Sequence, residues 1–388
     1  REDFRAISFW SRVPMIALAV GLGVLVFAFA RELFGPRAAL LAVALYSLEP
    51  TVLAHSRVVQ TDIPAAFGYL LLFYALYRYV PAPTWKRALA LGLAGGVAVL
   101  AKFSMLLAGP VLAATFVWLL WRAPRSGRRR KTVAAHAMVA ALALILLVQA
   151  AYFFDSRALL EADVRWASDA FGSNAGTVLG AVRALSYLFP TDFVLGVFWQ
   201  ASHNSAGHSA SLLGMYSHTG WWYYFPVAFA LKTTLPFLLL SLASLAWGCY
   251  ELFVRRDRRF LLLLVPFALY TAFVLPSRIN IGVRYYLPAF PFLFIMGGAL
   301  LDRLLASARA RRAAAAAALA LLAWVCVEAV RAYPDQMPYM NQLTAGRPGW
   351  QLLSDSNVEW GDDNRGLVEY LRSRGETRVR AATLGGFV

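Results

Sequence analysis

Charged residues and cysteine are scarce in this sequence of 388 residues. Only 15% of the residues are charged, against about 25% in an ordinary soluble domain, while 60% are hydrophobic. This balance argues against a large soluble enzyme whose apolar blocks are buried helices. The two cysteines, Cys249 and Cys326, lie inside apolar blocks, so they exclude a disulfide framework and a cysteine metal site. We expect both thiols to be buried.

Nucleotide-binding motifs are also missing. Neither a Walker motif nor a glycine-rich dinucleotide fingerprint occurs, which argues against a nucleotide-driven pump. For a transferase, the same absence argues against a soluble nucleotide sugar as donor. The net charge of +16 could indicate a nucleic-acid partner. However, the Lys and Arg residues form short clusters between apolar blocks, which is the topology signal of a membrane protein. We therefore expect no nucleic-acid partner.

The apolar blocks are long enough to cross a hydrocarbon core of about 30 Å. They predict an all-α integral membrane protein, a polytopic bundle of nine or ten transmembrane helices. The predicted spans are 13–30, 38–54, 63–78, 87–101, 104–121, 132–153, 223–247, 260–276 and 285–301, with a tenth, Ala-rich segment at 313–330.

Basic residues cluster in every second connection between these blocks. By the positive-inside rule these connections are cytoplasmic, and ten crossings keep the alternation consistent. The clusters are Arg31/Arg37, Arg78/Lys86/Arg87, Arg122 to Lys131, Arg255 to Arg259 and Arg303 to Arg312. The other connections then face outward: 54–62, 102–103, 155–222, 276–284 and the chain after Arg331.

Two outward segments are long. We expect residues 1–330 to form the transmembrane domain, whose outer loop 155–222 holds short interfacial helices, because the loop is rich in aromatic residues. Residues 331–388 predict the start of a small extracytoplasmic C-terminal domain, with a helix at 364–374 and an unfinished strand at 383–386. No internal repeat is visible, so the sequence lacks the signature of an inverted-repeat transporter.

Five cations lie on the outward side, where the rule predicts few: Arg57, Lys102, Lys232, Arg278 and Arg284. Some have structural explanations, since Arg57 could pair with Asp62 as an anchor and Lys102 could extend to the headgroups. Lys232 is placed two turns inside a predicted span, where an ammonium normally faces a polar cavity or an anion. Together the five predict a site for an anionic substrate, with phosphate as the obvious group.

Other polar and aromatic residues on this side offer weaker signals. His203, His208 and His218 do not have the spacing of a helical metal pair, so we assign no metal site, although a divalent metal stays open. His218 could reach substrate beside Trp221. Trp221, Trp222 and Tyr223 either line a lipid groove or form an interfacial aromatic belt. The helix that starts at Tyr285 would favour an anion through its exposed N–H groups.

Three segments resemble one family. The loop from His55 to Asp62, the segment from Gly220 to Thr233 and the segment from Ile279 to Pro288 are similar to the protein O-mannosyltransferase and aminoarabinose transferase superfamily. The stretch 355–363 is similar to a tail motif of its bacterial phospholipid-carrier-dependent glycosyltransferases, which usually have Asp where this chain has Glu359 and Gln where it has Asp362.

The resemblance implies the C-type glycosyltransferase fold and a polyprenyl-phosphate sugar as donor. It implies inverting transfer to a hydroxyl of a protein Ser/Thr or of a lipid, on the periplasmic face of a bacterial inner membrane. It also implies that the principal catalytic acid lies upstream of Arg1, in an N-terminal part absent here, so that this piece is inactive by itself. Asp62 is then a second acid, and the five cations bind the donor phosphate, with Arg57, Lys232 and Arg284 as first choices.

Two rival functions remain open at this point. A transporter or flippase of an anionic lipid-linked glycan would use the same cations without a catalytic base. An oligosaccharide ligase that transfers a whole glycan would share the fold and the donor phosphate. The upstream sequence would separate enzyme from transporter, because only an enzyme needs the acid.

Overall fold

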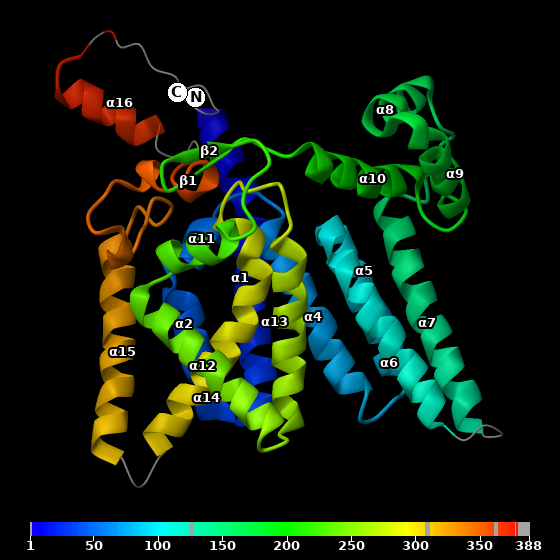
Figure 1. Ribbon diagram of the computed structural model, residues 1–388, viewed down its shortest axis with the longest axis horizontal. Coiled ribbons are helices and arrows are strands. Elements are labelled where there is room, and N and C mark those ends of the chain that lie inside the picture. The colour runs from blue at the N-terminus through cyan, green and yellow to red at the C-terminus, as the bar shows by residue number, and fades with distance from the viewer. Residues whose placement is uncertain (1, 124–127, 307–310, 361–363, 377, 379–388) are drawn as a thin grey trace.

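The computed structural model describes residues 2–123, 128–306, 311–360, 364–376 and 378. Within them the chain is mainly helical, and long helices run side by side along one direction (Figure 1). The predicted all-α bundle is confirmed; the strand predicted at 383–386 and part of the tail motif, 361–363, lie outside the described residues. The bundle contains α1 (Glu2–Phe34), α2 (Pro36–Leu48), α3 (Pro50–Ser56), α4 (Asp62–Tyr79), α5 (Trp85–Ala101), α6 (Gly109–Arg122), α7 (Arg128–Ala151), α12 (Leu235–Phe253), α13 (Leu261–Val274), α14 (Phe290–Ala306) and α15 (Arg311–Ala332).

Length and composition identify the segments able to cross a membrane. Six pass in the described chain: Ala6–Phe34, Phe103–Arg122, Arg129–Ala151, Leu235–Phe253, Val283–Ala306 and Arg312–Ala332. The pair α2 and α3, bent by 67°, could form a seventh. The protein is therefore a multi-pass membrane protein. The predicted count of ten stays a prediction, because α5 and α13 have only 17 and 14 residues and α4 is rich in tyrosine.

The helices differ in how far they are buried. In the candidate span that ends with α14, 72% of the apolar stretch is buried inside the protein, so this span lies at the centre of the bundle. In the spans that contain α6 and α15, only 17% and 22% of the apolar stretch is buried, so these helices lie at the periphery. Cys249 on α12 and Cys326 on α15 are both free and exposed. The expectation of buried thiols was wrong, because apolar blocks of a membrane helix also turn a face toward lipid.

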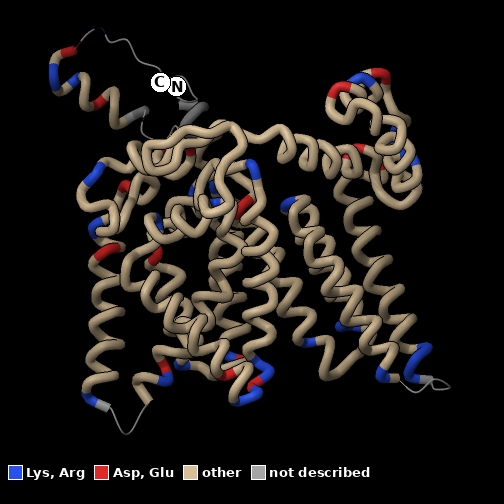
Figure 2. The backbone as a smooth tube through the Cα atoms, viewed as in Figure 1, with Lys and Arg blue, Asp and Glu red and all other residues tan. Residues whose placement is uncertain are grey.

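Charged residues gather at the two ends of the bundle, and the band between them carries few (Figure 2). The lower end in this view holds the ends of α1, α4, α6, α12 and α14, where the basic clusters fall. The upper end holds the long loop and the tail (Figure 1). The basic loops thus share one end of the molecule, as the alternation of charge predicts.

The long loop folds into short elements across the upper end. It contains α8 (Glu161–Phe171), α9 (Ala175–Leu185), α10 (Thr191–Ala206) and a hairpin of β1 (Ala210–Leu212) with β2 (Met215–Ser217). Figure 1 shows α10 lying across the direction of the bundle helices. The short helices expected here are present; their place on a bilayer stays a prediction. The last helix in the described part of the tail is α16 (Asn364–Ser373), which confirms the helix predicted there.

The predicted span 223–247 is broken into two helices. A short α11 (Tyr224–Lys232) ends before the extended residues Thr233 and Thr234, and α12 begins at Leu235. In a continuous helix Pro236 would clash with the carbonyl of Lys232 four residues earlier, whereas it suits the first turn of α12. The Glu49 carboxylate also accepts hydrogen bonds from the Thr234 backbone N–H (3.2 Å) and hydroxyl (3.0 Å). Lys232 is therefore the last residue of a short helix, and its placement two turns inside a span was wrong.

Candidate functional site

Asp62 is the centre of a buried charged cluster. Its side chain is fully buried at the first turn of α4. Lys102, which follows α5, places Nζ 2.6 Å from Asp62 Oδ1. Arg284, in the 3₁₀ segment η4 (Val283–Ala289) before α14, places Nη1 3.2 Å from Asp62 Oδ2. Three elements distant in sequence therefore bring two cations onto one carboxylate.

Aromatic rings and an amide complete the surroundings of these cations. Lys102 Nζ lies 3.7 Å from the centre of the Tyr285 ring, and the Arg284 guanidinium lies 4.0 Å from that of Trp360. The Gln60 side-chain oxygen accepts a bond from Arg284 Nη1 at 3.4 Å. Such contacts hold cations in place without neutralising them. With two cations and one carboxylate, the cluster keeps a net positive charge that favours an anion.

Two buried nitrogen atoms next to this cluster have no hydrogen-bond partner: Arg284 Nε and His55 Nδ1. His55 lies on α3 with 1% of its surface exposed, and Asp62, Lys232 and Arg284 all act on it electrostatically. Buried polar atoms are normally paired, so unpaired ones call for an explanation such as a bound group. Sequence reasoning gave His55 no role; a histidine beside Arg57 within a predicted outward loop was the available signal.

The described hydrogen bonds of the Lys232 ammonium do not reach Asp62. Lys232 is 1% exposed, and its ammonium donates to the backbone carbonyls of Met337 and Asn357, each at 2.6 Å. Both acceptors belong to the tail. Glu49, which is fully buried, lies near enough to interact with the ammonium. Sequence analysis did not select Glu49, although an acid inside an apolar block is a known signal of function.

The other two predicted phosphate ligands also donate to backbone carbonyls. Arg57 Nη1 donates to the carbonyl of Pro334 at 3.2 Å. Arg278 is exposed, and its Nη1 donates to the carbonyl of Ser205 at 3.1 Å. Lys102 and Arg284 are therefore the pair that shares Asp62 among the described contacts, and a single phosphate site formed by all five cations stays a prediction. Backbone carbonyls of the tail and the long loop bind the other three.

Of the aromatic and histidine residues predicted to line the substrate groove, one joins the Asp62 cluster and the others make their described contacts elsewhere. Tyr285 belongs to the Asp62 cluster. Trp222 is 69% exposed, Trp221 and Tyr223 pack against the main core, and exposed His218 pairs with Ser209 at 2.8 Å. None of their described contacts reaches Asp62.

The rings of His203 and His208 lie 6.2 Å apart, and no group of three or more potential metal ligands occurs among the described residues.

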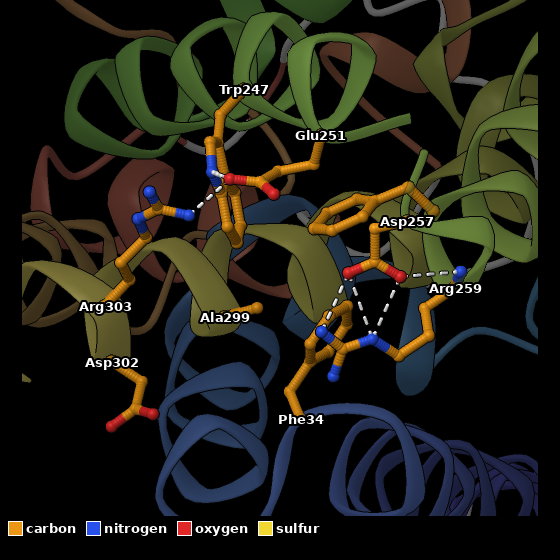
Figure 3. A pocket seen from close by; sticks show the side chains of 9 residues that line it. Phe34, Trp247, Glu251, Asp257, Arg259, Ala299, Asp302 and Arg303 are labelled. Atoms are coloured by element: carbon orange, nitrogen blue, oxygen red, sulfur yellow. Dashed lines mark hydrogen bonds and ion pairs between the residues drawn. The ribbon is translucent and has the colours of Figure 1, made fainter. Parts of the chain in front are cut away.

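A polar cavity lies among the ends of α12 and α14, away from the Asp62 cluster. It has a volume of about 180 Å³ and is lined by charged and aromatic side chains (Figure 3). Glu251 pairs with Arg303 and accepts from Trp247 Nε1 at 2.9 Å, while Asp257 binds Arg259 at 2.7 Å. These charges satisfy one another. We therefore assign this cavity a structural role in tying together the ends of α12, η3 (Arg258–Phe260) and α14.

Comparison with solved structures identifies the fold. The Archaeoglobus fulgidus oligosaccharyltransferase in its apo form is 16% identical, with a TM-score of 0.50 over 94% of this chain and 47% of that one. ArnT from Cupriavidus metallidurans bound to undecaprenyl phosphate is 18% identical, with a TM-score of 0.49 over 82% of this chain and 56% of that one. The chain thus spans about half the length of these structures. The fold predicted by resemblance is confirmed.

Comparison of sequences gives a family match for the first part of the chain. None of the curated proteins searched matches the chain. Residues 5–153, which include α1 to α7 and contribute Asp62 and Lys102 to the cluster, match the family described as dolichyl-phosphate-mannose-protein mannosyltransferase. This segment, which forms the first part of the bundle, is similar to that family.

Proposed function

We propose that this chain is part of a membrane glycosyltransferase that moves a sugar from a polyprenyl-phosphate donor to an acceptor hydroxyl. The observation that carries the proposal is the buried cluster of Lys102 and Arg284 on Asp62, with Arg284 Nε unpaired. A guanidinium and an ammonium at one point suit a phosphate, because Arg offers a planar fork and Lys a compact charge. The family that residues 5–153 match, whose description names a phosphate-linked sugar, supports the same donor class.

The reaction is a single displacement at the anomeric carbon of the donor sugar. The acceptor oxygen forms a bond to that carbon while the bond from carbon to phosphate oxygen breaks, so the configuration inverts. The acceptor proton passes to a carboxylate base, and the electron pair leaves with the lipid phosphate. Lys102 and Arg284 stabilise the charge that grows on the departing phosphate. Asp62 is bound to both cations, so its role is to orient them.

The test is transfer from a polyprenyl-phosphate sugar by the full-length protein in lipid nanodiscs. Arg284→Ala should lower kcat/KM by about a hundredfold or more, because a donor to the departing charge is lost. Arg347→Ala removes an exposed arginine on the same side of the molecule and should leave kcat/KM unchanged. Full activity of Arg284→Ala would remove the cluster from the mechanism. Donor binding without transfer to any hydroxyl would favour a transporter.

A further inference from the structure

The tail between Asp355 and Trp360 is fixed against the loop that carries Arg284. Asn357 is fully buried, and its side-chain oxygen accepts from the Val283 backbone N–H at 2.9 Å. Its side-chain nitrogen donates to the Tyr224 hydroxyl at 2.9 Å. Val283 is the residue before Arg284, so this side chain sets the distance between the tail and the cluster.

A second contact brings the two backbones still closer. The Ser356 hydroxyl is buried and donates to the carbonyl of Ile281. Gly282 has φ of +133°, and a Cβ there would lie 2.3 Å from Ser356 Oγ. Both the backbone conformation and the space therefore require glycine at this position. The approach of the tail is built into the loop that precedes Arg284.

Lys232 holds this part of the tail from the other side. A buried ammonium needs partners, and the described partners of Lys232 Nζ are the carbonyls of Met337 and Asn357. One is at the start of the tail and the other is beside the cluster. Asn341 repeats the arrangement, since its side chain donates to the carbonyl of Thr233 at 2.7 Å. The end of α11 is thus a docking point for the tail.

The docked tail places Trp360 over the guanidinium of Arg284, 4.0 Å from its central carbon. Asp62 binds the same guanidinium through Nη1, which leaves Nε without a partner. We propose that residues 354–360 form a wall of the donor site, in which Trp360 holds the Arg284 plane ready for a polyprenyl phosphate. In this arrangement Lys232 is a positioning residue that anchors the wall and does not touch the donor. The inference rests on the proposed function.

A double-mutant cycle on the full-length protein tests the wall. Binding of a sugar-free polyprenyl phosphate to nanodisc-embedded protein is measured for Trp360→Leu, Trp360→Phe, Arg284→Ala and the double variant Trp360→Leu with Arg284→Ala. Trp360→Leu should raise Kd by about fivefold to tenfold, and Trp360→Phe should restore most of the affinity because a ring is retained. In the Arg284→Ala background, Trp360→Leu should have no further effect. Trp350→Leu, an exposed tryptophan of the same tail, should bind like wild type.

The outcomes separate this inference from the proposed function. If wild type binds and Arg284→Ala weakens binding, but Trp360→Leu has no effect or an additive one, the wall is wrong and the proposed function stands. If wild type binds no polyprenyl phosphate, the proposed function fails first. If Trp360→Leu weakens binding in wild type but not in the Arg284→Ala background, the two side chains act together, and both the wall and the proposed function are supported.

Lys232→Met tests the anchor by hydrogen exchange of the tail, measured alongside affinity. Loss of the ammonium should raise hydrogen exchange across 354–360 and raise Kd, and Trp360→Leu should then add little. Ser356→Ala removes one hydroxyl and serves as the milder variant if Lys232→Met does not fold; it should loosen the same segment. Weaker binding by Lys232→Met with unchanged tail exchange would mean that Lys232 contacts the donor directly, and would overturn its role as anchor.

Discussion

At the scale of single residues, Asp62 is the most deeply buried charge of the cluster. It is fully buried, and the side chains of its partners Lys102 and Arg284 are 12% and 13% exposed. Removing one member of a buried ionic group leaves the remaining charges without compensation. This destabilises the fold more than replacing the whole group by apolar residues does. The stability of this region therefore depends on keeping the charges balanced.

Asp62→Asn should lower the free energy of unfolding by about 3 kcal/mol, because two cations lose their shared counter-charge. Adding Lys102→Met should recover part of this loss, since it removes one of the unpaired cations. Thermal denaturation in detergent measures both effects. Asp169→Asn, at an exposed acid of α8, is the matched control and should melt like wild type. A double variant less stable than Asp62→Asn would contradict the assigned pairing.

At the scale of elements, the outer loop has its own ionic clasp. Arg157, which precedes α8, binds Asp163 at 2.6 Å and Asp192, at the start of α10, at 2.6 Å. The hydrogen bond from Arg157 lowers the pKa of Asp163 below its ordinary value, against a smaller raising effect of burial. A carboxylate with a lowered pKa stabilises the fold fully above its ordinary pKa. That stability is lost as pH falls through the lower, folded-state value.

The clasp predicts a stability difference that depends on pH. At neutral pH, Asp163→Asn should destabilise the loop by up to about 1 kcal/mol, because the ion pair is partly exposed. This difference should begin to shrink as pH falls below about 4 and should vanish once pH has passed the lower pKa of folded Asp163, where wild type also loses its charge. Hydrogen exchange of residues 160–192, compared between the two proteins at each pH, measures it. Glu161→Gln should show no such trend; a constant difference for Asp163→Asn would rule out the clasp.

At the scale of the whole molecule, the two ends of the bundle differ in kind. The lower end carries the basic loops and the self-paired cavity of Figure 3, and the upper end carries the Asp62 cluster, the long loop and the tail. The positive-inside rule predicts that the lower end is cytoplasmic and that the site faces outward.

Single-cysteine labelling tests this orientation in intact cells. In a background with Cys249 and Cys326 replaced by Ser, Tyr216→Cys in the upper hairpin should react with a membrane-impermeant maleimide. Arg258→Cys at the lower end should react only after the membrane is opened; both positions are exposed, so access alone decides the result. Labelling of Arg258→Cys in intact cells would reverse the orientation and place the site in the cytoplasm.

The amino-acid sequence determined the helical bundle, the loop helices and the shared end of the basic clusters. These follow from the length of apolar blocks and the spacing of charge, which are local properties of the chain. It also selected Lys102 and Arg284, because the positive-inside rule predicts few cations on the outward side, while the family resemblance selected Asp62.

Only the tertiary structure decided which of these charges meet. Lys102 and Arg284 converge on Asp62 because η4 returns to the ends of α4 and α5, a contact between segments far apart in sequence. Lys232 instead bonds to the tail, because Pro236 and Glu49 end α11 early and turn its ammonium toward Met337 and Asn357. Which groups a charged side chain contacts depends on the packing of segments far apart in sequence, and this cannot be read from composition or periodicity.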